Sequence, residues 1–157
     1  MTTTTATASC VTTIGDAPLQ VGRKVGPTEW RRMTQEQVNQ FAEVTGDRNF
    51  IHVDPQRARE TPFRGTIAHG YLTLSLLAPI SQQLLVVTDA STSINYGLNK
   101  LRFPAPLPVG ADFRGRGEIV EVTPFDNGVQ VTASFTIEVK DAAKPALVAD
   151  CLFRYYR

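Results

Sequence analysis

The chain has 157 residues, which is enough for one domain with a substantial core. Sixteen basic and fifteen acidic residues leave a formal charge of +1, so the charge balance gives no reason to expect a nucleic acid or an acidic membrane as partner. An apolar fraction of 42% is ordinary for a globular protein and excludes wholesale disorder.

The N-terminal segment is rich in Thr and Ala and lacks the basic and apolar regions of a secretory signal. We expect residues 1–20 to form a mostly disordered tail and residues 21–157 to form the single domain. The two cysteines, Cys10 and Cys151, have no metal-ligand spacing, and Cys10 falls in the expected tail. They are typical of reduced thiols, which predicts a cytoplasmic protein.

The first folded half has a helical pattern. Thr34 and Gln37 have the spacing of a capping box, an apolar face follows, and Gly46 suits the left-handed end of this helix. Asp54 followed by Pro55 predicts the start of a second, short helix, with Asp as N-cap and Pro at the first helical position.

Residues 65–88 contain no Asp, Glu, Lys or Arg. The segment is long enough to span a membrane. However, polar side chains such as His69 and Gln82 would be costly in hydrocarbon, so a helix buried within the fold is the better interpretation. We expect this helix to cover residues 69–86, with a kink or break near Pro79.

In the second half the period changes from 3.6 to 2. Apolar and polar residues alternate over residues 129–139, which predicts a strand with one buried face, and Asp126-Asn127-Gly128 predicts a hairpin turn before it. Gly97 suggests a bulge in a strand. The other expected strands cover residues 93–103, 112–123 and 147–156, with a short one around 29–33.

A helix that is apolar almost all round needs cover on most sides. Four or five long strands joined mostly by hairpins could supply it, which predicts an α+β domain with an antiparallel sheet curled around a central helix. The exposed edges of such a sheet would invite a partner subunit.

Both histidines of the chain lie close together in sequence. Asp47 and His52, with Gly46 and Asn49 in a loop-like setting, can form an acid–base pair near neutral pH. Taken singly, an Asp is more often a solvated loop carboxylate and a His more often a structural residue. The choice between these interpretations depends on the whole set of motifs.

Three ordered segments resemble MaoC-like dehydratases, the (R)-specific enoyl-CoA hydratases. They are Phe41-Ala42-x-x-Thr45-Gly46-Asp47-x-Asn49-x-Ile51-His52-x-Asp54, then Ile67-Ala68-His69-Gly70, and Asn99-Lys100-Leu101-Arg102-Phe103 followed by Pro106, Val109 and Gly110. Residues 95–99 look most like the short actinobacterial members. The resemblance extends from about Gly22 to Tyr156.

The resemblance implies a hot-dog fold, a homodimer and water addition to trans-2-enoyl thioesters. It implies that Asp47 and His52 hold a water and transfer protons, while Asn49 donates its amide to the water or to the Asp47 carboxylate. Gly70, at the start of the central helix, would donate its backbone N–H to the thioester oxygen, which could approach closely because glycine lacks a Cβ. His69 is expected mainly to orient this loop.

Acyl thioester binding is expected at the residues around this motif and at nearby cations. The expected substrate-binding residues are Ala68, His69, Tyr71, Lys100 and Arg102. Candidates for the phosphates of coenzyme A are Arg57, Arg59, Arg64, Lys100 and Arg102, and for each a solvated surface charge is an equal alternative.

One position departs from the family pattern. Phe50 stands where the family often has Pro, so the rigidity of this loop must come from packing, or the pocket changes shape. No set of His, Cys and carboxylates completes a zinc site, and no Gly-rich loop indicates a nucleotide phosphate site, so neither a metal nor a redox cofactor is expected.

Two other functions compete with the hydratase hypothesis. An acyl-CoA thioesterase on the same fold usually carries a carboxylate on the central helix, and residues 69–86 contain none. A non-catalytic acyl-CoA-binding subunit would have no chemical need for Asp47, Asn49 and His52 together.

Overall fold

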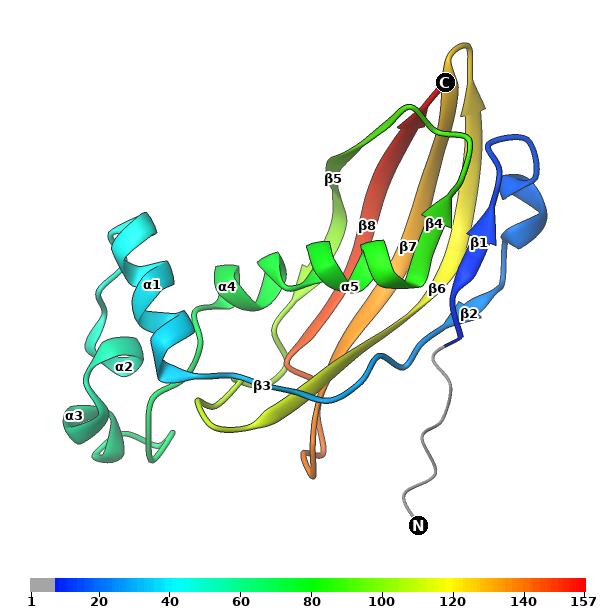
Figure 1. Ribbon diagram of the computed structural model, residues 1–157. Helices are drawn as coiled ribbons and strands as arrows, with labels where there is room; N and C mark the ends of the chain where they lie inside the picture. The colour runs from blue at the N-terminus through cyan, green and yellow to red at the C-terminus, as the bar shows by residue number, and fades with distance from the viewer. Residues whose placement is uncertain (1–7) are drawn as a thin grey trace.

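The computed structural model describes residues 8–157, and Figure 1 shows a curved sheet with helices beside it. The main sheet has the strand order β2-β6-β7-β8-β5, with β3 also paired to β6, and every pairing in it is antiparallel. Its strands are β2 (Lys24–Val25), β3 (Arg31–Arg32), β5 (Thr92–Arg102), β6 (Asp112–Phe125), β7 (Gly128–Val139) and β8 (Leu147–Tyr156). The four long strands are therefore close to the expected ones.

Strand β7 lies in the middle of the sheet and shows why the alternating pattern was informative. Its alternate apolar residues Val129, Val131, Ala133, Phe135 and Ile137 are all at most 1% exposed. Phe125 pairs with Gly128 across the turn, as the Asp-Asn-Gly segment predicts. One face of the sheet is thus buried against the helix that crosses it (Figure 1).

The central helix is slightly shorter than expected and is broken near Pro79. It consists of α4 (Gly70–Ser75) and α5 (Leu77–Leu84), with the interruption at Leu76. The expected break is therefore present, three residues before the proline. The reason is that proline lacks an N–H and its ring clashes with the carbonyl four residues earlier, which is that of Ser75.

The helix ends at Leu84 because the next residues join a strand pair. β4 (Leu85–Val87) lies parallel to β1 (Cys10–Thr12), and the 3-10 helix η1 (Ala17–Gln20) follows β1. The expectation of a disordered tail over residues 1–20 was therefore wrong for residues 10–20, while residues 1–7 lie outside the described part. Cys10 is fully buried. The free energy gained by this burial holds the segment in place, although the Thr-rich composition around it suggested disorder.

Three short helices precede the central helix and hold the loop that carries Asp47. They are α1 (Gln35–Thr45), α2 (Phe50–Val53) and α3 (Pro55–Arg59). The capping box of Thr34 and Gln37 is present, and Gly46 ends α1 with a φ of 78°. Asp54 caps α3 as predicted. Helix α2 was not expected, because the sequence suggested only a loop there.

Strand β5 forms one edge of the main sheet, and nearly every residue in it is exposed in the single chain. Its pairing with β8 is irregular on either side of Gly97, which confirms the expected bulge. No helix within residues 8–157 is both long and apolar enough to cross a membrane.

Candidate active site

The fold brings Asp47, His52 and His69 into one cluster. Asp47 lies in the loop after α1, His52 lies in α2, and His69 is the N-cap of α4. One carboxylate oxygen and one nitrogen from each ring all lie within 4.8 Å of one another. The sequence placed these residues near each other along the chain, and the structure places their functional atoms together.

His52 is held in one tautomer by its surroundings. Its Nδ1 lies 2.7 Å from the carbonyl oxygen of Ile67. A carbonyl oxygen can only accept, so Nδ1 carries the proton and donates it, which leaves the lone pair of the neutral ring on Nε2. The side chain is buried, at 7% exposure. Neutral His52 is therefore a preoriented proton acceptor at Nε2.

His69 is fixed in the same way through its other nitrogen. Its Nε2 donates to the backbone carbonyl oxygen of Asp47 at 2.9 Å, so His69 supports the loop that carries the carboxylate. Its ring lies between that of His52, at a centroid distance of 3.9 Å, and that of Phe41, at 5.0 Å. Nδ1 of His69 is buried and has no hydrogen-bond partner among the described residues. His69 is thus bound into the loop structure, as the sequence analysis expected.

The carboxylate of Asp47 is exposed and is held by the following turn. Oδ1 accepts a hydrogen bond from the backbone N–H of Asn49 at 3.3 Å. The side-chain oxygen of Asn49 caps α2 by accepting from the N–H of Ile51. The contact to Asp47 is thus made by the backbone N–H of Asn49, while the side-chain oxygen of Asn49 caps α2. The cap leaves the NH₂ group of Asn49 available, so its donation to the catalytic water stays a prediction.

The environment keeps His52 neutral. Burial lowers the pKa of the His52 imidazole, and its proximity to His69 lowers it further, while the bond to Ile67 and the charge of Asp47 act in the opposite direction. The net direction is downward from the ordinary value of 6.5. His52 therefore keeps its free lone pair at neutral pH, which a general base requires.

The same three groups form a potential metal-ligand set that the sequence analysis had discounted. However, the two imidazole planes are stacked and differ by only 27°. Because ring lone pairs lie in the ring planes, two stacked rings do not point their nitrogens at one ion, as a tetrahedral site needs. This geometry suits a shared water better than a metal, and the absence of a metal stays a prediction.

Gly70 follows His69 directly and begins α4. A Cβ on Gly70 would lie 3.2 Å from Cε2 and 3.3 Å from Cζ of Phe103. The space that a side chain would need is therefore filled by this ring. The sequence analysis had linked the missing Cβ to the approach of a thioester oxygen, whereas the structure links it first to packing against Phe103.

The expected substrate-binding residues have unequal positions. Ala68 is buried, and its N–H donates to the carbonyl oxygen of Leu107 at 2.8 Å, so it contributes to the framework. Tyr71 is 73% exposed beside Gly70. Lys100 and Arg102 are exposed on β5, and Arg102 directly precedes the Phe103 that contacts Gly70. Of the expected set, His69 belongs to the cluster itself. Ala68 and Tyr71 lie close to it in the chain, whereas no contact ties Lys100 to it among the described residues.

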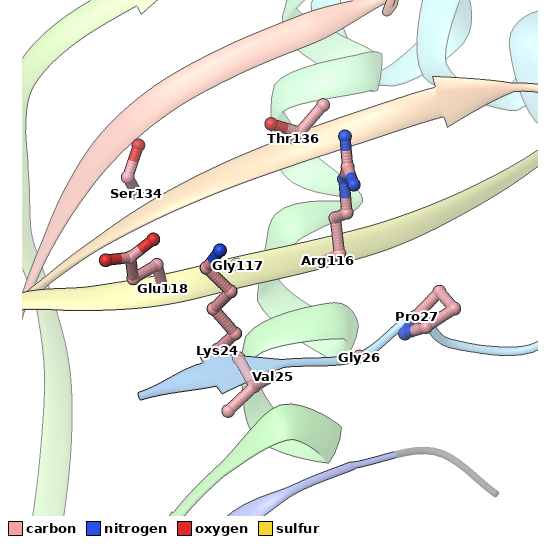
Figure 2. A pocket seen from close by; sticks show the side chains of 9 residues that line it. All are labelled: Lys24, Val25, Gly26, Pro27, Arg116, Gly117, Glu118, Ser134 and Thr136. Carbon is pink, nitrogen blue, oxygen red and sulfur yellow. The ribbon is translucent and has the colours of Figure 1, made fainter. Parts of the chain in front are cut away.

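The pocket in Figure 2, of about 480 Å³, lies elsewhere on the protein. Arg116 and Thr136 project into it from β6 and β7, and Lys24 reaches it from β2 (Figure 2). Gly115, one position from Arg116, would direct a Cβ at Ile80 of α5, so Arg116 faces away from the central helix. This pocket includes neither histidine and has no part in the cluster.

Comparison with known proteins places the chain in a family. A profile described as "MaoC like domain" matches residues 16–140. The chain belongs to the MaoC-like family. It is 50% identical to 3-hydroxyacyl-thioester dehydratase Z of Mycobacterium tuberculosis over 143 residues. The matched region covers 90% of this chain and 95% of that protein.

Solved structures agree with the family at the level of the fold. The R-hydratase of Pseudomonas aeruginosa has a TM-score of 0.72 and 26% identity, covering 87% of this chain and 82% of that one. The (R)-hydratase from A. caviae has a TM-score of 0.70 and 26% identity, and the match covers 85% of this chain and 94% of that one. The expected hot-dog fold of MaoC-like proteins is confirmed.

Sequence reasoning missed residues around the MaoC-like motif that shape the cluster. Phe103 was named in a motif but could not be placed in space, and Gln35 and Thr66 were not considered for the site. Gln35 and Thr66 are joined by a hydrogen bond of 2.6 Å although they lie 31 positions apart. Nothing in the local pattern indicates such a contact, since it depends on how α1 packs beside the segment before α4.

Proposed function

We propose that this MaoC-like protein is a hydro-lyase that interconverts trans-2-enoyl thioesters and (R)-3-hydroxyacyl thioesters. Two observations carry the proposal: the bond from Nδ1 leaves Nε2 of His52 free, and a nitrogen of this ring lies within 4.8 Å of a carboxylate oxygen of Asp47. The relatives support it, because they include a 3-hydroxyacyl-thioester dehydratase and two R-hydratases.

Asp47 and His52 would act together on one water. Nε2 of His52 accepts a proton from the water while the Asp47 carboxylate orients it, and the water oxygen attacks C3 of the enoyl group. A proton from the same pair is then delivered to C2. The sum is one water added across one double bond, with no redox change, so the chemistry requires neither a metal nor a redox cofactor.

The negative charge that develops on the thioester oxygen needs a donor. Gly70 is the first residue of α4, where backbone N–H groups have no acceptor within the helix. We assign this N–H to the thioester oxygen, and a donor of this kind typically contributes about 3 kcal/mol to transition-state stabilisation. Phe103 on the Cβ side of Gly70 would keep water from that side of the oxygen.

An apolar pocket of about 300 Å³ begins one turn along the helix from Gly70. It lies between the central helix and strands β5 and β8, with Leu74 and Ala78 on one wall and Leu98, Leu152 and Phe153 on the other. We assign the acyl chain to this pocket, because a chain whose carbonyl is at Gly70 would extend along the helix into it.

Coenzyme A would bind only as part of the substrate. The candidate cations Arg57, Arg59, Arg64, Lys100 and Arg102 are all exposed. The guanidinium of Arg57 lies over the ring of Phe50, 4.2 Å from its centroid, which fixes this cation beside the motif. The assignment of phosphate contacts to these residues is part of the proposal.

We also propose a homodimer in the cytoplasm. Edge strand β5 exposes Ile94, Tyr96 and Leu98 at 44%, 51% and 43%, and an apolar sheet edge of this kind is suited to pairing with a second copy. Light scattering should give twice the chain mass, and Ile94→Lys, which lies outside the proposed acyl pocket, should shift it toward the single chain. Cys10 and Cys151 are free thiols, which suits a reducing compartment.

The function is tested with purified protein and crotonyl-CoA. Loss of absorbance of the enoyl thioester and chiral analysis of the product should show (R)-3-hydroxybutyryl-CoA. Release of free coenzyme A thiol without hydration would indicate a thioesterase instead. Tight binding of enoyl thioesters of every chain length without turnover would indicate a non-catalytic binding subunit.

A further inference from the structure

Gln35, the first residue of α1, connects three segments through its side-chain amide. Its Nε2 donates to the backbone carbonyl oxygen of His52 at 2.7 Å and to Oδ1 of Asn39 at 2.9 Å. Its Oε1 accepts from the hydroxyl of Thr66 at 2.6 Å. Both N–H donors and the carbonyl oxygen of one amide are thereby used.

The orientation of this amide follows from its partners. The carbonyl oxygen of His52 can only accept, so the NH₂ end of Gln35 must face α2. The oxygen end then faces Thr66, whose hydroxyl can donate. The opposite orientation would set two oxygens against each other, so the bridge has a single arrangement.

The bridge closes a ring of contacts around His52. The ring of His52 donates to the carbonyl oxygen of Ile67, and the N–H of Ile67 donates to the carbonyl oxygen of Ile51. Thr66 is the residue before Ile67, and Gln35 ties it back to the carbonyl oxygen of His52. The imidazole and the backbone of His52 are thus fixed to the same segment from two sides.

We infer that Gln35 is a positioning residue for His52, and that it acts together with Thr66 through this bridge. The inference rests on the proposed function of His52 in proton transfer. Gln35 does not touch the reacting atoms. Its role is to hold α2 against residues 66–67, so that Nε2 of His52 stays directed at the water beside Asp47.

The local sequence explains how the amide is placed. The capping box of Thr34 and Gln37 fixes where α1 begins, and Gln35 is the next residue after the cap. Thr66 is buried at 7% exposure, and its bond of 2.6 Å to the half-buried Gln35 is partly buried. A short, partly buried bridge on a capped helix start holds position better than a fully exposed surface contact.

The test uses Gln35→Leu, Thr66→Val and the double variant, which remove the bridge and keep similar volumes. We expect kcat for crotonyl-CoA to fall about 10- to 100-fold with KM within about twofold, because a misplaced base slows the chemical step. The double variant should be no slower than the slower single variant, because both changes break one bridge. Thr66→Ser, which keeps the hydroxyl, should recover most of the kcat.

Gln40→Leu is the matched control. Gln40 lies on the same helix, is exposed, and donates a side-chain hydrogen bond to Glu36 at 3.3 Å. Its kcat should equal that of the wild type. Unchanged kcat in both bridge variants, losses that multiply in the double variant, or a rise in KM alone would each overturn the inference.

A second readout does not depend on turnover. The imidazole ¹⁵N shifts of His52 should report a single Nδ1–H tautomer in the wild type and a mixture in Gln35→Leu and Thr66→Val. Unchanged shifts in both variants would overturn the inference. If the wild type hydrated no enoyl thioester, the proposed function would fail, and these spectra would still decide whether the bridge positions His52. Should Gln35→Leu not fold, Thr66→Val supplies the same measurements.

Discussion

The rings of His52 and His69 stack with their centroids 3.9 Å apart and their planes 27° from parallel. Each ring donates its one N–H to a backbone carbonyl oxygen, His52 to Ile67 and His69 to Asp47. The two histidines therefore divide two tasks. His52 presents a free Nε2 to the site, whereas His69 holds the loop that carries the carboxylate.

The activity should persist well into acid. The pKa of His52 is lowered from 6.5, chiefly by burial, so the neutral base survives below that pH. We expect the acid limb of the pH profile of kcat/KM with crotonyl-CoA to have its midpoint below 6.5. A midpoint at or above 6.5 would show that another group, or an imidazole more exposed than this one, controls the rate.

The same lowered pKa gives a prediction for stability. Because the folded state disfavours the charged form of His52, its contribution to the free energy of unfolding is fully present above pH 6.5 and is lost as the pH falls through the lowered pKa. Urea unfolding between pH 7 and pH 4 should therefore show a smaller decline in His52→Gln than in the wild type. Parallel curves for the two proteins would contradict this.

Gly70→Ala should damage the site through Phe103. The new methyl group would lie 3.2 Å from the ring, which must move, and we expect a loss of at least about tenfold in kcat, as small displacements in an active site commonly cause. Phe103→Leu in the same chain should recover part of it. Gly65→Ala is the control, since a Cβ there meets nothing within 4 Å. If the double variant does not recover activity, the methyl group itself blocks the substrate, and displacement of the Phe103 ring is not the cause of the loss.

Phe50→Pro should be tolerated. Phe50 is the first residue of α2, a position that accepts proline because its N–H has no acceptor within the helix. The change removes the contact with Arg57, an exposed cation–π interaction of about 0.5–1 kcal/mol. We expect kcat within about twofold of the wild type and a Tm lowered by a few degrees at most. A tenfold loss of kcat would show that the ring itself shapes the site.

The β1 segment can be tested with neighbouring residues. Cys10 is fully buried against the core, whereas Val11 next to it is 56% exposed. Cys10→Asp should lower the free energy of unfolding by about 3 kcal/mol or more, because it buries a charge, and Val11→Asp should change it by about 0.5 kcal/mol. Equal, negligible effects in thermal melts would restore the expectation of a disordered tail.

The elements that the sequence predicted well are those with a local cause. The period of β7 reflects one buried face, and the box of Thr34 and Gln37 is complete within one helical turn. The elements that it predicted badly depend on distant partners. Cys10 is ordered because β1 pairs with β4, and that pairing also ends the central helix at Leu84.

The site was predictable in its types of residue but not in its contacts. Asp47 and His52 could be selected from their chemistry and motif, whereas the contact of the Asn49 backbone N–H with Asp47 could not, because it depends on the turn that the chain makes before α2. The bridge from Gln35 to Thr66 joins segments whose packing the local sequence does not encode. Such contacts appear only when the helices are placed in space.

The most direct test of the account is the hydration of crotonyl-CoA by the wild type and by Asp47→Asn, with Glu43→Gln as control. Asp47 and Glu43 are both exposed near the C-terminal end of α1, so neither change should alter folding. We predict (R)-3-hydroxybutyryl-CoA from the wild type and from Glu43→Gln, and a rate lower by about 10²- to 10⁴-fold for Asp47→Asn. An (S)-product, or undiminished activity of Asp47→Asn, would contradict it.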